Sequence, residues 1–290
     1  MLTTSLVIGL VLGGTYALAA LGLTMQYGVS RIMNLAYGEF VIVAAFATFV
    51  LVSTLGLDPL LSLLLVGPAA FVISYAVYSV LMAPLVKRSR KGGNLEIDSI
   101  LVTFGLLFLI QGILLVIFGA DFQSYSYLNV AVDLFGVTIA ANQVLAFGLA
   151  TVLGIGLFLL IRFTRWGLIL RAVAHRPDNA PLVAINVDRV AQLAFAFGGM
   201  LAAQAGVVIS MFQTFTATAG VVFTMKALIV VIMGGVGNFL GALIAGLILG
   251  LVEAFVSAYL DPGLTLASTY LIFLVLLLWR PQGLFGKSVS

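Results

Sequence analysis

The sequence predicts an all-α protein, a polytopic transmembrane helical bundle, and three observations support this fold class. Of the 290 residues, 63% are hydrophobic and 8% are charged, whereas soluble globular chains are about half apolar and about a quarter charged. The apolar residues fall into nine long runs, and most of the basic residues gather between these runs. We therefore expect one transmembrane domain over residues 1–290.

The nine runs are candidates to cross the hydrocarbon core, which is about 30 Å thick and takes about 20 helical residues. They cover residues 6–25, 41–52, 60–86, 100–118, 143–161, 190–212, 221–233, 239–259 and 264–279. No Lys or Arg precedes the first run, so we expect a retained helix and not a cleaved signal peptide. If an interrupted run only dips into the membrane and returns, eight runs span, and the count of eight or nine stays open.

Two stretches interrupt the apolar sequence, at residues 28–39 and 234–241. Each contains a glycine–valine step, an asparagine and a closing glycine: Gly28, Asn34 and Gly38 in the first, and Gly235, Asn238 and Gly241 in the second. Paired glycine-interrupted segments in two halves of a chain are typical of a transporter site near the membrane midplane. The alternative is that these glycines recur by chance or serve close packing. Close packing does suit the ridge of small residues at Ala242, Gly246, Gly250 and Ala254.

Three ionisable residues lie within or beside apolar sequence: Glu39, Lys226 and Glu253. Each would cost about 3 kcal/mol if it faced lipid, so each is expected to face protein or water. For Lys226 we expect a side chain that extends to the lipid headgroups. Glu39 suits the first turn of a helix, and Glu253 suits either an interhelical hydrogen bond or the substrate path.

The distribution of charge predicts the orientation. Basic clusters occur at residues 87–91, within residues 162–189, and at Arg280 and Lys287, whereas the stretches around Asp58, 121–133 and Asp261 carry acids and no base. Because basic loops stay on the cytoplasmic side, we expect a cytoplasmic C-terminus and an extracytoplasmic loop over residues 119–141.

The longest polar stretch, residues 162–189, contains five arginines and the only histidine. Pro177 ends any helix that runs from Trp166, Asp178 can cap a new one, and Asn186 can end it. The stretch therefore predicts a short cytoplasmic helix over about residues 179–185, with Leu182, Val183 and Ile185 available to a partner. An ordinary loop between helices is the alternative.

The composition excludes several classes of function. A chain with one histidine and no cysteine cannot build a zinc or di-iron centre, so we expect no metal, no cofactor and no enzyme. The phosphate-binding loop pattern fails at Pro281, where it requires glycine. The basic residues lie at membrane boundaries and form no stripe with interleaved aromatics, which argues against nucleic acid as a partner.

Four stretches in order carry a resemblance to a known family: GLTMQYGVSRIMNLAYGEF, RAVAHRPDNAPLVAIN, GGVGNFLGALIAG and RPQGLFGK. Together they cover nearly the whole chain and resemble the LivH-type permease of bacterial branched-chain amino acid ABC importers. The resemblance implies a multi-pass protein of the bacterial inner membrane. It also implies a second related permease as heterodimer partner, two ABC ATPase subunits and a periplasmic substrate-binding protein.

The resemblance also assigns roles. The central segment would be the coupling helix that docks the ATPase, with candidate residues Arg171, His175, Arg176, Asp178, Asn179, Leu182, Val183, Ile185 and Asn186. The broken stretches would line the path of a branched-chain amino acid, with candidate residues Gly28, Asn34, Tyr37, Gly38, Glu39, Gly235, Gly237, Asn238 and Glu253. Backbone amides there would meet the substrate carboxylate and carbonyls its ammonium.

This chain departs from the family at two positions. Ala184 stands where relatives commonly have glycine, so the turn after the coupling helix is expected to rely on Asn186, and Tyr37 stands where many have histidine. Two alternative functions stay open. One is a urea or short-amide ABC permease, and the other is a self-contained ion-coupled transporter with Glu39 and Glu253 as relays.

Overall fold

A computed structural model describes residues 2–89, 94–134, 137–177 and 179–286. Its helices are α1 (Leu2–Ser30), α2 (Tyr37–Leu55), α3 (Pro59–Val77), α4 (Ala83–Ser89), α5 (Leu95–Phe118), α6 (Ala141–Phe163), α7 (Arg165–His175), α8 (Val187–Ser210), α9 (Gly220–Gly234), α10 (Phe239–Tyr259) and α11 (Thr265–Trp279). A π-helical turn, Tyr78–Met82, joins α3 to α4, and short 3-10 turns cover Ala180–Val183 and Pro262–Leu264. Eight helical segments of the described chain are long and apolar enough to cross a membrane, and α9 is shorter. The predicted fold class is confirmed.

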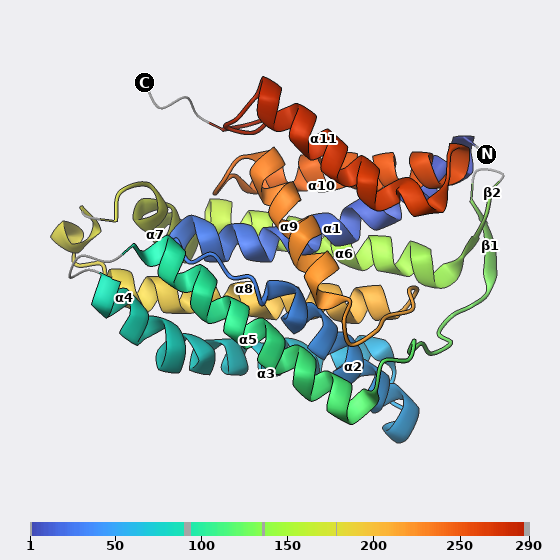
Figure 1. The fold of residues 1–290 in the computed structure, drawn as a ribbon, viewed down its shortest axis with the longest axis horizontal. Helices are drawn as coiled ribbons and strands as arrows, with labels where there is room; N and C mark the ends of the chain where they lie inside the picture. Colours follow the sequence, from blue (N-terminus) through green and yellow to red (C-terminus); the bar gives the residue numbers. More distant parts are fainter. Residues whose placement is uncertain (1, 90–93, 135–136, 178, 287–290) are drawn as a thin grey trace.

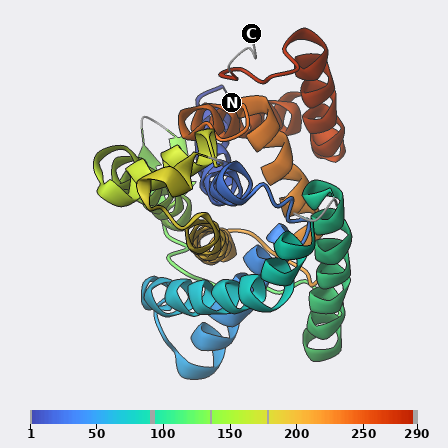
Figure 2. The same cartoon turned by 90° about the vertical axis from the view of Figure 1, so that its left-hand side faces the viewer.

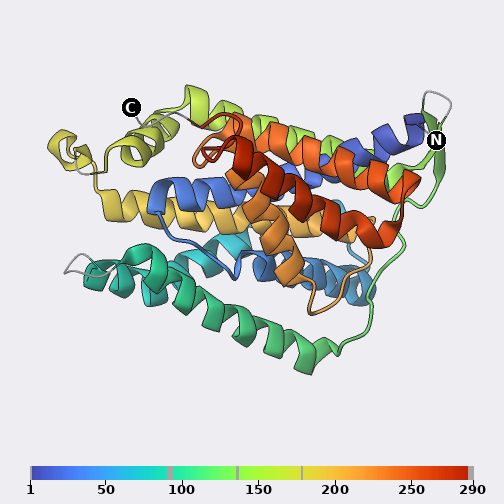
Figure 3. The same cartoon turned by 45° about the horizontal axis from the view of Figure 1, so that its top comes forward.

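The helices run between two ends of one bundle (Figure 1). Helices α4, α6 and α11 finish at one end of the bundle, which we call the basic end because Lys87, Arg162 and Arg280 lie at the ends of these helices. Helices α2, α5 and α10 finish at the opposite end of the bundle. We call this the acidic end because Asp58, Asp121 and Asp261 follow these helices. Helix α1 begins at the acidic end and α11 finishes at the basic end (Figures 1 and 3). Each of the nine predicted runs contains a helix in the described chain, and eight of these helical segments are long enough to cross a membrane.

Helix α1 lies in the middle of the bundle and packs most closely on α10 (Figure 2). The small-residue ridge of α10 faces α1, as the close-packing interpretation predicted. A side chain at Gly250 would overlap the backbone of Gly13, and a Cβ at Gly246 would lie 2.6 Å from Ala17 Cα. In a bilayer such close contact provides much of the attraction between helices.

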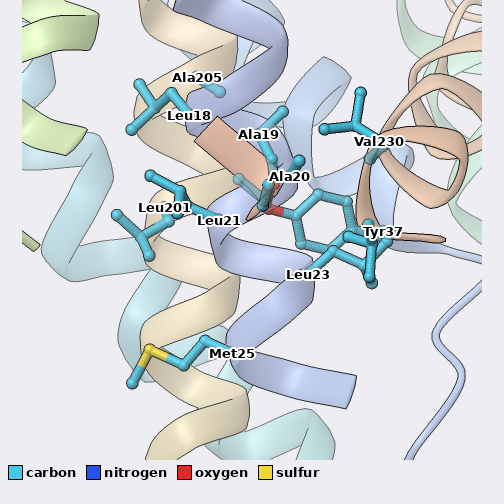
Figure 4. Close-up of a cluster of buried hydrophobic side chains, with 14 of the residues drawn as sticks. Leu18, Ala19, Ala20, Leu21, Leu23, Met25, Tyr37, Leu201, Ala205 and Val230 are labelled. Carbon is cyan, nitrogen blue, oxygen red and sulfur yellow. Dashed lines mark hydrogen bonds between the residues drawn. The ribbon is translucent and has the colours of Figure 1, made fainter. Parts of the chain in front are cut away.

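Helix α8 packs on the other side of α1 and also contacts α2 and α3. Leu18, Leu21 and Leu23 of α1 pack in one buried cluster with Leu201 and Ala205 of α8 (Figure 4). By contrast, α5 and α11 bury little of their surface within the chain. The bundle thus has an inner group of helices and a set of outer helices with exposed apolar faces.

The connection between α5 and α6 contains a feature that the sequence analysis missed. Strand β1 (Ala131–Leu134) pairs antiparallel with β2 (Val137–Ala140). Ahead of this hairpin, Gln123 exchanges two backbone hydrogen bonds with Phe215, which lies in the link between α8 and α9. The predicted extracytoplasmic loop is therefore attached to the segment that leads into α9.

Candidate functional site

The first broken stretch, residues 31–36, is irregular chain between α1 and α2 and ends in a turn at Leu35 and Ala36. Its backbone is hydrogen-bonded by side chains. Ser99 Oγ accepts from the amide of Met33 at 3.1 Å, and Thr103 Oγ1 accepts from the amide of Leu35 at 3.1 Å. The Asn34 side chain accepts from the amide of Ala36 at 3.1 Å. Irregular backbone at membrane depth needs partners of this kind, and here the protein supplies them.

Asn34 and Tyr37 fix this stretch against its neighbours. Asn34 is fully buried and donates to Gln26 Oε1 at 3.1 Å. Tyr37 is fully buried, and its hydroxyl donates to the carbonyl of Ala19 on α1 at 2.6 Å, with the ring set against α1 (Figure 4). Both candidate path residues are thus engaged within the chain.

The N-termini of α2 and α9 meet inside the bundle. Thr224 of α9 accepts from the amide of Gly38 at 2.8 Å and donates to the carbonyl of Leu35 at 3.1 Å. From this junction α2 runs toward the acidic end and α9 runs toward the basic end (Figure 1). At 15 residues, α9 is about 22 Å long, so it covers only part of a membrane core. The positive ends of two helix dipoles therefore converge on one point.

Glu39 occupies this junction, in the first turn of α2 as predicted. Its side chain is fully buried, and within the described part of the chain neither carboxylate oxygen has a hydrogen-bond partner. The carboxylate lies against Gly220, the first residue of α9, so closely that a Cβ there would overlap it. The two helix N-termini supply the favourable potential that a buried carboxylate needs.

The second broken stretch, residues 235–238, joins α9 to α10. Gly235 and Gly237 have φ values of 95° and 78°, a conformation that glycine adopts without strain. Asn238 caps α10 by accepting from the amide of Gly241 at 3.0 Å, and it donates to the carbonyl of Phe285 at 3.2 Å.

The end of α1 touches the second broken stretch, because a Cβ at Gly28 would lie 3.1 Å from Gly237 Cα. Gly28 was predicted to lie in the first break, but it is helical, and the break begins at Arg31. The structure thus brings the two matching motifs together at the basic end of the bundle. Their place along the substrate path stays a prediction.

Glu253 takes part in a buried interhelical network. Its Oε2 accepts from the hydroxyl of Tyr16 at 2.7 Å and from Lys226 Nζ at 2.9 Å, and its Oε1 accepts from Thr269 at 2.8 Å. The ammonium of Lys226 also donates to the Tyr16 hydroxyl at 2.7 Å and lies 4.4 Å from the centre of the Tyr16 ring. Of the two interpretations of Glu253, the interhelical hydrogen bond is the one observed.

The expectation that Lys226 extends to the headgroups was wrong. Its side chain is only 14% exposed, because it points inward to Glu253. The carboxylate, the Tyr16 hydroxyl and the Tyr16 ring are the partners that a buried ammonium requires.

A cavity of about 460 Å³ reaches this network from the acidic end. Tyr16 and Glu253 belong to its lining, together with Gln213, Ser257 and Thr265. The network therefore lies at the inner limit of a recess that starts among the polar residues of the acidic end.

The predicted coupling segment is a short 3-10 helix, Ala180–Val183, between α7 and α8. Leu182 and Val183 are 84% and 69% exposed, whereas Ile185 packs partly against the core. Asp178 lies outside the described residues, and Asn179 precedes the turn without a capping side-chain bond. Two apolar side chains thus project from the basic end with no partner in the described chain.

Asn186 was predicted to end this helix, and this prediction was wrong. Ala184 ends it, with a left-handed φ of 60°, and Asn186 instead caps α8 by accepting from the amide of Arg189 at 3.1 Å. The left-handed position falls directly after the 3-10 turn, two residues before Asn186. Ala184 takes the conformation that glycine would supply with less strain.

Arg171, His175 and Arg176 precede this segment. Arg171 and His175 line a cavity at the basic end together with the end of α1, while Arg176 follows the last residue of α7. Pro177 follows the end of α7 by two residues, as predicted.

Sequence reasoning missed the polar residues that support the site. Ser99, Thr103, Thr224 and Thr269 are buried hydroxyl residues within apolar helices. The spacing of Ser99 and Thr103, which places both on one face of α5, was the available signal. Nothing in the sequence shows which broken stretch they serve.

The chain is similar to known transport permeases, which is consistent with its bundle of apolar helices. Residues 5–279 match the family described as "Branched-chain amino acid transport system / permease component". A similar protein is the high-affinity branched-chain amino acid transport system permease protein LivH of Salmonella typhimurium, which is 30% identical over 96% of this chain and 94% of its own. BraD of Pseudomonas aeruginosa is 29% identical over 97% and 95%, and LivH of Escherichia coli K12 is 29% identical over 96% and 94%. No solved structure matches the chain.

Proposed function

Because the chain belongs to the branched-chain amino acid transport system permease family, we propose that it carries branched-chain amino acids across the bacterial inner membrane. In this proposal the transport is driven by two separate ABC ATPase subunits, and a second, related permease completes the membrane path. A periplasmic binding protein delivers the substrate at the acidic end. The basic end then faces the cytoplasm, in keeping with the positive-inside rule.

The exposed segment at Leu182 and Val183 is the observation that carries the proposal. Two large apolar side chains on a short turn, with Arg171 and Arg176 in the segment before it, suit a contact that transmits a rigid shift between subunits. ATP binding would press on this turn, and hydrolysis would release it. Three residues join the turn to α8, which contacts α1, α2 and α3.

For the substrate path, we propose the two broken stretches and the junction that α2 and α9 form. Supporting this are the contact between Gly28 and Gly237 and the buried carboxylate of Glu39 at two helix N-termini. The amides of Met33, Leu35 and Gly38 are engaged by side chains in this structure. Contact of these groups with a zwitterion therefore requires an exchange of partners when the permease changes state.

Co-purification followed by reconstituted uptake tests this function. The tagged chain, extracted in mild detergent, should bring down two ATPase subunits and a second permease. The complex in liposomes should take up leucine, isoleucine or valine when ATP and the binding protein are present. Uptake of urea in place of these amino acids would replace the substrate assignment. A chain that purifies alone and transports without ATP would overturn the proposal in favour of a gradient-driven transporter.

The docking assignment has its own test. Arg171→Glu and Val183→Pro should each leave the ATPase active but uncouple it from uptake. Lys87→Glu, a charge reversal elsewhere at the basic end, is the matched control and should stay coupled. Normal coupling in both docking variants would refute the assignment.

A further inference from the structure

A cavity at the basic end shares Gly28, Gly237 and Asn238 with the proposed substrate path and Arg171 and His175 with the docking segment, but neither role explains the charge of its lining. Its volume is about 800 Å³. The end of α1, the end of α6, α7 and the link between α9 and α10 enclose it, and Figure 2 looks onto the end of the bundle where these elements meet. Its basic lining residues are Arg31, Arg162, Arg171 and His175.

The charge of this cavity is strongly one-sided. Three arginines line it, and Glu96 is the only acid among its lining residues in the described chain. The carboxylate of Glu96 accepts from the Tyr27 hydroxyl at 3.4 Å. The cavity therefore presents an excess of positive charge to whatever enters it.

Arg171 and Arg162 have partners within the chain, but their guanidinium groups keep hydrogen-bond donors free for a ligand. Arg171 donates to the carbonyls of Arg162 and Gly167 at 3.3 and 3.4 Å, and a guanidinium carries more N–H donors than these two bonds use. The guanidinium of Arg162 lies 5.7 Å from the ring centres of both Phe158 and Phe163. Both groups keep donors for an anion, and arginine binds phosphate oxygens in pairs.

The other part of the lining is apolar. Phe158, Phe239 and Leu240 lie along it, and Leu240 is 47% exposed. Phe239 and Leu240 are also the first residues of α10, so the positive end of that helix adds to the potential. An anionic group with an apolar neighbour suits such a surface.

We propose that this cavity binds a phosphate-bearing anion at the basic end of the permease. The headgroup of an anionic phospholipid and a soluble phosphate compound share this chemistry. Basic pockets between membrane helices on the cytoplasmic side bind anionic headgroups in this way. The proposal is independent of the substrate that the permease carries.

Binding of defined probes to the purified permease, together with its co-isolated subunits, tests the site. Phosphatidylglycerol, phosphatidylcholine and inorganic pyrophosphate are titrated separately and measured by native mass spectrometry. Arg31→Gln and Arg162→Gln should each weaken binding of the anionic probe about fivefold, the change expected for one basic residue near an anionic headgroup. Arg165→Gln removes the same charge from the first residue of α7, which is not part of the cavity lining, and it should change binding less than about twofold.

Each outcome decides the proposal. Arginine-dependent binding of phosphatidylglycerol over phosphatidylcholine supports it with a lipid as the source, and arginine-dependent binding of pyrophosphate alone supports it with a soluble source. Binding of neither anion, or equal weakening by Arg165→Gln, overturns it. If the variants fold poorly, hydrogen exchange on the unmodified protein replaces them. Protection of residues 27–31 and 237–241 by an anionic probe supports the site, and its absence overturns it.

Discussion

Lys226 Nζ lies 2.9 Å from Glu253 Oε2, and this ion pair joins the short helix α9 to α10. The Tyr16 hydroxyl bridges both groups, so α1 belongs to the same network. Because the carboxylate and the ammonium neutralise each other, the network favours a structural role for Glu253 over that of a free proton relay. It also holds α9 in place, although α9 is too short to cross the membrane alone.

Removing one member of this pair should destabilise the protein. Lys226→Met or Glu253→Gln leaves a buried charge without its partner, which costs about 3 kcal/mol or more. The double variant removes both charges, so its loss should be smaller than the sum of the single losses. Thermal unfolding in detergent measures this, with the exposed Glu96→Gln as control. Strictly additive losses would contradict a direct interaction.

Uptake by Glu253→Gln separates two mechanisms. If the pair is structural, protein that folds should keep ATP-driven uptake. If folded Glu253→Gln protein instead loses an uptake that an ion gradient drives, this would favour Glu253 as a relay in an ion-coupled transporter.

Gly220→Ala should disturb the junction between α2 and α9. The added methyl group would overlap the Glu39 carboxylate. Because this carboxylate is the end of a flexible side chain that can move, the cost should be about 1 kcal/mol, at the low end for overpacking. Combining it with Glu39→Ala removes the overlap, so the double variant should lose less than the two single losses together. Gly112→Ala on α5 is the control, because nothing lies within 4 Å of its added Cβ. Equal effects of Gly220→Ala and Gly112→Ala would contradict the close contact.

Leu182→Asp should weaken ATPase docking without unfolding the permease. The side chain is 84% exposed, so its replacement should change the unfolding temperature little, while a charge in an apolar contact should lower recovery of the ATPase at least tenfold, on the order of 1.4 kcal/mol. Leu260→Asp, on a residue 72% exposed beyond α10 at the acidic end, is the control. Full ATPase recovery with Leu182→Asp would remove this residue from the docking surface.

Ala184→Gly should stabilise the docking segment. Ala184 has a φ of 60°, and glycine at such a position relieves about 1 kcal/mol of strain. Limited proteolysis between α7 and α8 should become slower. Ala180→Gly, in the 3-10 turn itself, should have the opposite effect, and faster cleavage with Ala184→Gly would contradict the observed conformation.

Because of Tyr125, the stability of the fold should decrease at alkaline pH. Burial raises the pKa of Tyr125 to about 12, from about 10 in an unfolded chain. The folded state then retains a proton that the unfolded state releases, so stability is complete below pH 10 and falls as the pH rises toward 12.

Thermal unfolding across this pH range measures the effect. Tyr125→Phe lacks the hydroxyl that lies 2.9 Å from Ser210 Oγ, and it should lose stability less steeply than the natural protein. Identical slopes would show that the hydroxyl is not buried against α8.

The sequence by itself determined the class of protein, the helices and the interrupted stretches. Hydrophobic runs of about 20 residues have one stable form in a bilayer, since each helix satisfies its own backbone. The glycine pattern therefore located both breaks, and Pro177 located the end of α7. The ridge of small residues on α10 also predicted close packing against another helix, because small side chains let two helix backbones approach each other.

Only the tertiary structure decided which polar side chains pair with one another across the helices. Lys226 finds Glu253 on the next helix, and Thr224 hydrogen-bonds Gly38 across 186 positions of the chain. A helix that is apolar all round gives no sign of which face turns inward, so the direction of Lys226 was predicted wrongly. The left-handed turn at Ala184 was missed for a related reason. The place where the segment must turn is set by how α7 and α8 are packed, and alanine adopts a conformation there that its own preference disfavours.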